Sequence, residues 1–335
     1  MKILMIGGTG ILSMEISRQL CASGHELYLL NRGNRIQELQ AENIHYLTCD
    51  IHDENSARTA LGDLNFDVVA DFIAFLPEHI ERDYRLFQGR TQQFIFVSSA
   101  ATYEKPPSKP IITETTPLSN PHWEYARHKI ACEETAMIFH SANNFPVTIV
   151  RPSHTYDERK IPLGVYGNNG TWQVAQRMLD GKAVIIHGDG SSLWTMTHTR
   201  DHAKGFIGLM GNPTAIGEAI HITSDESLTW NQIYGAIAGA LGVRLQAIHI
   251  PSWTLHRNSP YDFEGGLIGD KANSVIFDNS KLKRLVPGFE AATPFSKGVA
   301  ETAAHILEHP EFQEHDPAFD AWCDEMINRY QSMTQ

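Results

Sequence analysis

The feature that most constrains the fold is a regular alternation of short apolar segments and helical segments over residues 1–150. These segments, such as "DVVADFI" at 67–73 and "FIFV" at 94–97, are mostly apolar without a polar–apolar alternation, which is typical of strands covered by helices on both faces. Strands joined by helices pair in parallel. We predict an α/β doubly wound parallel sheet. Strands are expected at residues 2–6, 26–30, 44–48, 67–73, 93–98 and 147–150, and helices at 11–22, 35–40, 56–61, 77–87 and 121–142.

The alternation ends near residue 157, and glycines follow in a loop at 164–170. The later segments are shorter and mixed, which indicates a smaller region laid over the strand ends. We therefore expect a dinucleotide-binding domain at 1–156. Residues 157–335 should form a mainly substrate-binding, mixed α/β region, with a stretch at about 183–210 returning to the first domain.

Composition removes several functional classes. The 335-residue chain has a net charge of −12 and no run of Lys and Arg, so nucleic-acid binding is not favoured. Its 4 cysteines are scattered and its 17 histidines show no HExxH pattern, so neither a disulfide framework nor a metal site is predicted. No apolar run reaches membrane-spanning length and no signal peptide is evident. We expect a cytoplasmic protein.

The stretch "MIGGTGILS" places a glycine-rich turn directly between the first strand and the first helix. Glycines there let the backbone approach a pyrophosphate, which lies at the helix N-terminus, as in a Rossmann fold. Ser13 stands where a third glycine is usual. The predicted cofactor contacts in this turn are Gly7, Gly8, Thr9, Gly10, Ile11 and Leu12.

The stretch "LLNRGNR" ends the second strand without the acid that would hold the ribose hydroxyls of NAD. Asn31 and Arg32 stand there instead, with Arg35 nearby. An arginine suits the 2′-phosphate of NADP, although Arg32 as a solvated turn residue fits equally well, so the cofactor is NADP or NAD with NADP slightly favoured. Asp50 is placed to accept a hydrogen bond from the adenine amino group. The neighbouring Ile51 and the strand-terminal Pro152 complete the predicted cofactor contacts.

Tyr125 and Lys129 in "WEYARHK" lie one turn apart near the start of the helix expected at 121–142, which Asn120 can cap. By itself this spacing is typical of two surface neighbours on one helix face. The rest of the chain must decide whether the pair is catalytic.

The chain resembles the extended short-chain dehydrogenases/reductases, in particular the NAD-dependent epimerase/dehydratase group of sugar-nucleotide enzymes. The likeness covers most of the chain and is carried by "GGTGILS", "FIFVSSAATYE", Tyr125-x-x-x-Lys129, "VRPSHTYD", and "GDGSS" before "HTRDHAKGF". It implies that Tyr125 moves a substrate proton while hydride passes to or from the nicotinamide. It also implies that Lys129 favours the phenolate and bonds the nicotinamide ribose, and that Ser99 orients the substrate oxygen.

Two departures from the family pattern concern the substrate. Dehydratases of the group carry an acidic pair where this chain has Ala100 and Ala101, so dehydration is disfavoured. The arginine that usually binds a diphosphate is replaced by Trp194, which can stack on a ring or simply pack between domains. A diphosphate would need other cations, such as Arg177, Arg257 or Lys271. We predict Trp194, Arg177 and His154 as substrate contacts.

Three functions remain open. The preferred one is an NAD(P)-dependent epimerase acting on a carbinol of a sugar, nucleotide sugar or nucleoside through a transient ketone. The alternative is an NADP-dependent reductase or dehydrogenase. The third is a non-catalytic relative, since "GGTG", "NRG" and "DVVADF" also resemble a plant plastid subgroup associated with RNA. The intact Ser99, Tyr125 and Lys129 and the net charge of −12 make it less favoured. A homodimer is expected through the helix bearing Tyr125, which carries Ile130, Met137 and Ile138.

Overall fold

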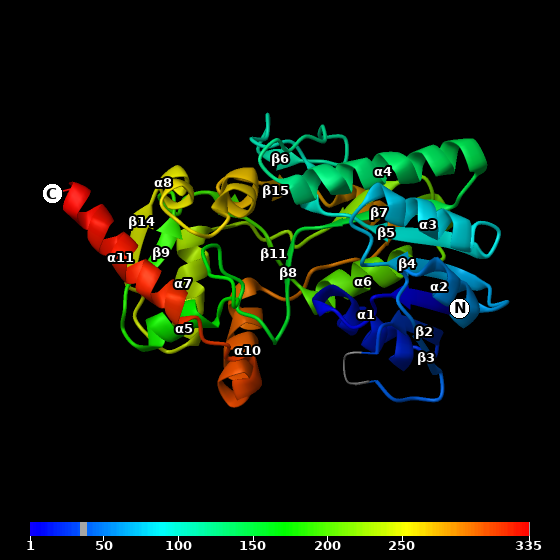
Figure 1. Cartoon of the computed structure of the whole chain (residues 1–335), viewed down its shortest axis with the longest axis horizontal. Helices are drawn as coiled ribbons and strands as arrows, with labels where there is room; N and C mark the ends of the chain where they lie inside the picture. The colour runs from blue at the N-terminus through cyan, green and yellow to red at the C-terminus, as the bar shows by residue number, and fades with distance from the viewer. Residues whose placement is uncertain (34–38, 335) are drawn as a thin grey trace.

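The computed structural model describes residues 1–33 and 39–334 and is built on a seven-stranded sheet (Figure 1). All its strand pairs are parallel, in the order β12-β7-β5-β4-β1-β2-β3. The order reverses beside β1, which is where ligands bind in such sheets. The predicted fold class is confirmed. The strands are β1 (Lys2–Ile6), β2 (Glu26–Asn31), β3 (Ile44–Thr48), β4 (Phe66–Asp71), β5 (Thr91–Val97), β7 (Val147–Pro152) and β12 (Ala219–Ile222).

Helices cover both faces of this sheet, which explains why its strands are largely apolar. On one face, Leu4 and Ile6 of β1 pack in a core with α2 (Glu54–Leu61), α3 (Pro77–Phe87) and α4 (Glu124–Asn143). On the other face, Ile3 and Met5 pack with α1 (Ile11–Ala22) and α6 (Thr199–Leu209). The helix expected at 35–40 falls largely on residues 34–38, outside the described part of the chain.

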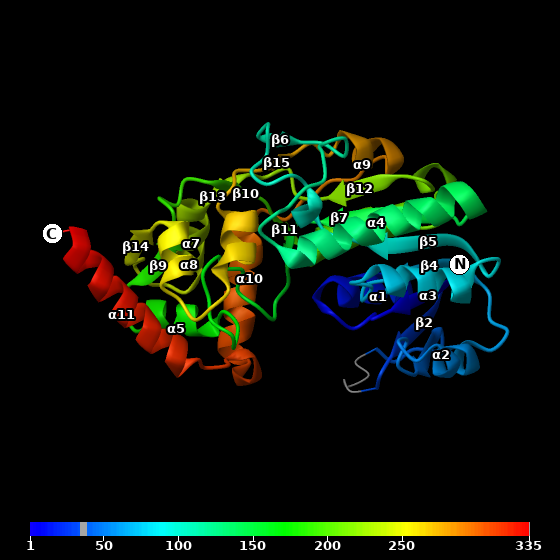
Figure 2. The same cartoon turned by 45° about the horizontal axis from the view of Figure 1, so that its top comes forward.

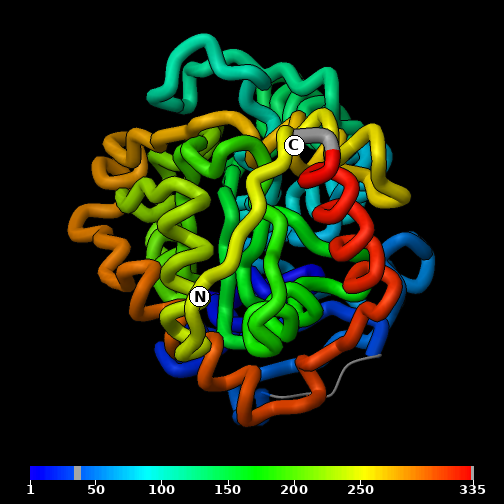
Figure 3. Tube along the Cα trace, turned by 90° about the vertical axis from the view of Figure 1, so that its left-hand side faces the viewer, coloured from blue at the N-terminus to red at the C-terminus, as the bar shows by residue number. Residues whose placement is uncertain are grey.

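A second lobe forms its own core around Trp194, Trp230, Tyr234 and Phe319. Short strand pairs hold it together: β9 with β14 and β8 with β11 in parallel, and β10 with β13 antiparallel. Figure 2 shows the helices around these strands, and Figure 3 shows α11 running along one side of the lobe. The elements are β8 (His154–Tyr156), α5 (Trp172–Leu179), β9 (Val184–His187), β10 (Leu193–Trp194), β11 (Met196–His198), β13 (Leu228–Thr229), α7 (Trp230–Ala240), β14 (Ala247–Ile250), α8 (Ser252–Arg257), the π-helix η3 (Glu264–Lys271), α10 (Phe295–Glu308) and α11 (Pro317–Thr334).

The chain returns to the sheet more than once after residue 157. Of the stretch expected to return at 183–210, α6 lies on the sheet, whereas β9 pairs with β14 in the second lobe. Two further returns were not expected: β12 adds an edge strand beside β7, and α9 (Ser280–Leu285) packs beside β12. Just before α9, β15 (Ile276–Phe277) pairs with β6 (Ile111–Ile112).

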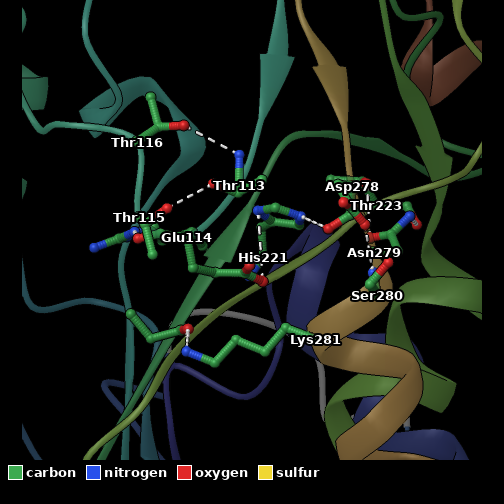
Figure 4. A network of polar contacts seen from close by, with 12 residues as sticks. Thr113, Glu114, Thr115, Thr116, His221, Thr223, Asp278, Asn279, Ser280 and Lys281 are labelled. Atoms are coloured by element: carbon green, nitrogen blue, oxygen red, sulfur yellow. Dashed lines mark hydrogen bonds and ion pairs between the residues drawn. The ribbon is translucent and has the colours of Figure 1, made fainter.

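Polar contacts fasten this last return to the sheet edge (Figure 4). His221 Nε2 lies 2.9 Å from the carbonyl oxygen of Asp278, and Asn279 donates to the carbonyl oxygen of Thr223 at 3.0 Å. Lys281 Nζ donates to the carbonyl oxygen of Ala219 at 2.8 Å. The segment after η3 is therefore joined to β12 by main-chain acceptors that any sequence supplies, which explains why no motif revealed it.

The helix bearing Tyr125 begins later than predicted. Its first residue is Glu124, with Trp123 in the capping position. Asn120 does not cap it: this buried side chain donates to the carbonyl oxygens of Ala101 at 2.9 Å and Gly269 at 2.7 Å. The predicted cap is wrong because Asn120 instead joins the short helical turn after β5 to η3. Within the described part of the chain, every helix is too short or too polar to cross a membrane.

Candidate active site

The glycine-rich turn is shaped by close packing and by one serine. Gly7 has φ 81°, and a Cβ there would lie 2.6 Å from Ile73 Cγ2. Ser13, at the position of the usual third glycine, donates to the carbonyl oxygen of Gly7 at 2.7 Å and accepts from the amide of Gly10 at 2.8 Å. Ser13 therefore closes the turn with hydrogen bonds that a glycine could not make.

A cleft of about 340 Å³ opens against this turn; we call it the glycine-turn cleft. Predicted cofactor residues that line it are Gly7, Thr9, Gly10, Asn31, Arg32, Asp50 and Ile51. The helix that begins at the turn has no acidic residue in its first turn, so its N-terminus suits an anionic group. The residues present fit a dinucleotide: a glycine cradle, a helix N-terminus and polar groups at the far end.

Other predicted cofactor residues lie elsewhere. Gly8 faces the sheet, because a Cβ there would lie 2.6 Å from Leu29 Cδ2. Leu12 packs on the core beneath the sheet. Ile11 lines neighbouring cavities, and Pro152 lines the cavity around Tyr125. Sequence reasoning missed five lining residues of the cleft: Leu30, Cys49, His52, Ile73 and Phe75.

At the far end of the cleft, some side chains near the ends of β2 and β3 are held by hydrogen bonds and others are exposed. Asn31 Oδ1 accepts from the amide of Gly33 at 2.9 Å, which folds this side chain back on its own turn. Arg32 is exposed at the rim. Asp50 Oδ1 accepts from the amide of His52 at 3.0 Å, which fixes its carboxylate beside the cleft. Among the described residues that line the cleft, Arg32 is the one with a guanidinium group.

A second cavity, of about 280 Å³, brings Ser99, Tyr125, His154 and Trp194 together; we call it the Ser99–Tyr125 cavity. Ser99 Oγ accepts from the amide of Ala101 at 3.1 Å. Burial raises the pKa of Tyr125, and a hydrogen bond with Ser99 opposes that rise. The phenol of Tyr125 lies beside Phe75, with ring centroids 6.3 Å apart, so this cavity adjoins the glycine-turn cleft.

Lys129 is fixed beneath Tyr125. Its ammonium donates to the carbonyl oxygens of Ala74 and Val97, each at 2.7 Å, and lies 5.9 Å from the centre of the Tyr125 ring. Only 2% of the residue is exposed. Burial lowers the pKa of Lys129 to about 8. The helical spacing noted in the sequence therefore places a buried amine beside a phenol.

Two adjacent serines follow β5 and have different partners. Ser98 is buried and donates to Glu133 Oε1 at 2.5 Å. Glu133 in turn accepts from Arg151 Nε at 2.9 Å. Ser98 thus belongs to a buried ion-pair network that joins β5, α4 and β7, while Ser99 faces the cavity.

The predicted substrate residues divide. Trp194 Nε1 donates to His154 Nδ1 at 3.2 Å, and both line the Ser99–Tyr125 cavity. Burial lowers the pKa of His154 to about 3, which leaves the ring neutral and able to accept. Trp194 also packs 5.8 Å from Trp230, so it serves the core as well.

Arg177 is the clear correction. It is 1% exposed, and its guanidinium donates to Asp320 Oδ1 at 2.6 Å and Asp324 Oδ1 at 2.7 Å. It ties α5 to α11 and does not line the cavity, so its predicted contact with substrate is wrong. Arg257 is exposed and lies over the Trp253 ring. Of the cations considered from the sequence, Lys271 reaches the cavity.

Several lining residues of the Ser99–Tyr125 cavity were missed. Lys105 follows the serine segment but belongs to no motif, and Asp270 comes from η3 in the distant C-terminal part. Trp123 and Tyr166 add aromatic walls. Among the described residues, no group of three or more His, Cys, Asp and Glu side chains is arranged to hold a metal ion.

Comparisons with known proteins show the family and the fold of the chain. Residues 3–223 match the model of the NAD dependent epimerase/dehydratase family. The chain is 23% identical to 2′-dehydrokanamycin reductase of Streptomyces kanamyceticus, over 87% of this chain and 80% of that protein. It is 27% identical to chloroplast stem-loop binding protein of 41 kDa b of Arabidopsis thaliana, over 72% of this chain and 63% of that protein. An epimerase structure from Methanothermobacter thermautotrophicus shares the fold, with a TM-score of 0.75, 20% identity and 93% coverage of both chains.

Proposed function

This chain belongs to the NAD dependent epimerase/dehydratase family, and from that premise we propose that it inverts a carbinol of a sugar-type substrate. The reaction would oxidise the carbinol with NAD(P) and return the hydride to the opposite face of the ketone. One observation carries the proposal: Ser99 and Tyr125 face one cavity, above Lys129 and next to the glycine-turn cleft.

Tyr125 is the proton carrier in this proposal. A phenol near pKa 10 is a weak base at neutral pH, and burial raises the pKa of Tyr125 further. The hydrogen bond with Ser99 opposes that rise, and the nearby Lys129 ammonium favours the phenolate. When bound, the nicotinamide supplies hydride acceptance and return. Ser99 would hold the substrate oxygen while Tyr125 takes its proton.

Lys129 also has a positioning role. An ammonium carries three donors, and carbonyl oxygens of Ala74 and Val97 take two of them. The third is available to a hydroxyl of the nicotinamide ribose. Because the lysine is buried and doubly anchored, it would set the distance between the ring and Tyr125.

Dehydration remains disfavoured, because Ala100 and Ala101 line the cavity and neither side chain can protonate a leaving hydroxyl group. The carboxyl group among the described lining residues is Asp270, and it faces Lys105 and Lys271. We therefore propose removal and return of hydride at one carbon without loss of a hydroxyl.

Paired substitutions test the proton role. Tyr125→Phe keeps the ring and removes the ionisable oxygen, so turnover should fall about 10²–10⁴-fold while NAD(P)H binding persists. Tyr84→Phe is the matched control, because Tyr84 lies on α3, stacks on Phe139 and does not line the Ser99–Tyr125 cavity. The assay screens sugars and nucleotide sugars, in deuterated water, for an inverted hydroxyl. No solvent deuterium on carbon and no net change in nicotinamide absorbance are expected.

Failure would take distinct forms. If NAD, NADH, NADP and NADPH all fail to bind at millimolar concentration by calorimetry, the enzyme proposal falls. Deuterium on a neighbouring carbon would indicate enolisation or elimination. Unchanged turnover in Tyr125→Phe would remove that residue from the mechanism.

A reductase is the second candidate, favoured by the exposed position of Arg32 and by the similarity to 2′-dehydrokanamycin reductase. A reductase releases its oxidised cofactor at each turnover, whereas an epimerase can retain it. Steady loss of reduced-nicotinamide absorbance with a ketone substrate would decide for the reductase. Cofactor that co-purifies with the protein would favour the epimerase.

RNA binding, suggested by the chloroplast relative's name, has less support. The net charge of −12 opposes the phosphate contacts on which such binding depends. A salt-dependent shift of RNA mobility by the purified protein would revive this function.

We also propose a symmetric homodimer that forms through α4. Ile138 on this helix is 62% exposed, and Ile130 is half-buried, so the isolated chain leaves apolar surface there. A dimer is the commonest closed assembly. A monomer mass by light scattering at micromolar concentration would contradict it. The free cysteines fit the reducing cytoplasm that we propose as its location.

A further inference from the structure

We infer that Lys105 and Lys271 form a subsite for one anionic substituent of the substrate, so that the preferred substrate is a sugar ring bearing a carboxylate or a phosphate. This inference rests on the proposed function, because it names the class of molecule that the Ser99–Tyr125 cavity takes. Neither lysine belongs to the motifs that indicated the family.

The charges at this end of the cavity do not cancel. Lys105 Nζ lies 3.9 Å from Asp270 Oδ1, and Lys271 Nζ lies 3.8 Å from Asp270 Oδ2. The exposed fractions are 5% for Lys105, 8% for Lys271 and 9% for Asp270. Two ammonium groups therefore share one carboxylate in a largely buried place, which leaves an excess of one positive charge.

The ammonium groups also lack hydrogen-bond acceptors. Each can donate three hydrogen bonds. Within the described ranges, Lys105 Nζ has no hydrogen-bond partner, and Lys271 Nζ has a single one, the carbonyl oxygen of Gly266 at 3.1 Å. A buried charge without partners is costly, and an anion in the cavity would supply the missing acceptors. Burial lowers the pKa of Lys105 and raises that of Asp270, as expected for incompletely paired groups.

No other described group around the cavity supplies the missing negative charge. His154 is neutral because burial lowers its pKa to about 3. Lys129 adds positive charge, although its ammonium is directed to the carbonyl oxygens of Ala74 and Val97. The aromatic side chains of Trp123, Tyr166, Trp194 and Phe277 also line the cavity and carry no charge.

The size and walls of the cavity suit one ring. Its volume of about 280 Å³ lies just below the range of about 300–1,000 Å³ usual for small-molecule sites. Lys105 Nζ lies 5.8 Å from the centre of the Trp194 ring. A sugar ring stacked on the indole would therefore have its substituents next to the ammonium group. Trp194 stands where the family usually has the arginine that binds a diphosphate. Two point charges on flexible stems match a single anionic group.

Binding of matched probes tests the subsite. Calorimetry on the complex with NADH or NADPH compares D-glucose with D-glucuronate and with glucose 6-phosphate, and D-galactose with D-galacturonate. At least one anionic probe should bind ten or more times as tightly as its neutral partner. This ratio corresponds to a difference of about 1.4 kcal/mol in binding free energy. The uronate and phosphate arms show which anion the site takes.

Variants assign the effect to the lysines. Lys105→Met and Lys271→Met should each remove most of the preference for the anionic probe without changing NAD(P)H affinity. Asp270→Asn should increase the preference, because it removes the competing carboxylate. Lys283→Met is the control: this lysine pairs with Asp225 on the surface, and its side chain is 45% exposed.

The possible results distinguish failure of the anionic subsite from failure of the proposed function. Equal binding of neutral and anionic probes by the unaltered protein overturns the subsite, as does binding of none of these sugars to a complex that holds NAD(P)H. A preference that persists in both lysine variants also overturns it. Failure to bind NAD(P)H at all would instead overturn the proposed function. Circular dichroism checks that each variant folds, and the result for the unaltered protein decides even if a variant does not fold.

Discussion

The amino group of Lys129 should make the stability of the cofactor-free protein depend on pH. The residue is 2% exposed, and burial lowers its pKa from 10.5 to about 8. The nearby Cys132, Asp71 and Glu133 favour the charged amine, but less strongly than burial disfavours it. The folded chain therefore releases the Lys129 proton at a lower pH than the unfolded chain.

The sign and size of the effect follow from linkage. Between about pH 8 and 10.5 the unfolded chain binds more protons than the folded chain, so stability rises with pH in that window. The contribution of Lys129 to stability is lost as the pH falls towards 8, and below pH 8 this contribution is constant. Each pKa unit corresponds to about 1.4 kcal/mol, so the Lys129 charge destabilises the fold by about 3 kcal/mol at neutral pH. About 2 kcal/mol of that should be recovered between roughly pH 7.5 and 9.5.

Urea unfolding of the original protein and of Lys129→Met over that range measures the effect. The variant leaves the carbonyl oxygens of Ala74 and Val97 without their donor, which shifts its stability by an amount that does not depend on pH. The difference between the two proteins should rise by about 2 kcal/mol over these two pH units. Lys283→Met, an exposed control, should show no such slope. A difference that stays flat over this range would refute the reasoning.

Three other substitutions probe the clefts and the second lobe. Arg32→Asp should weaken NADPH about tenfold or more relative to NADH in calorimetry; an unchanged ratio would leave Arg32 a turn residue. Ser13→Ala removes the hydrogen bonds to Gly7 and Gly10 and should weaken cofactor binding by about 1 kcal/mol; unchanged affinity would show that the turn holds without them. Arg177→Met should lower the free energy of urea unfolding by about 1–3 kcal/mol at unchanged KM; a raised KM at normal stability would restore its substrate role.

The sequence was sufficient for the sheet because local pattern and tertiary environment agree there. Ile3 and Met5 face one core and Leu4 and Ile6 the other, so both faces of β1 are apolar and the strand reads as one continuous run. The pair of Tyr125 and Lys129 was also predictable, since four-residue spacing on a helix sets their relation directly. The family and the class of enzyme predicted from these motifs are confirmed.

The failures share a physical cause, namely partners far away in the sequence. Arg177 meets Asp320 and Asp324 of α11, and Asn120 meets the carbonyl oxygen of Gly269. Nothing near Lys105 indicates that η3 will place Asp270 beside it. A charged or amide side chain carries no local signal that separates a buried structural tie from a ligand contact.

The late arrival of β12 has a consequence for the chain as it leaves the ribosome. The outer edge of β7 pairs with β12, yet much of the second lobe must be synthesised between these two strands. At about 5–20 residues per second, the nascent sheet spends seconds with the outer edge of β7 unpaired. Such an edge can recruit strands from another chain. Chaperone demand, and aggregation of fragments that end near residue 156, should therefore centre on β7.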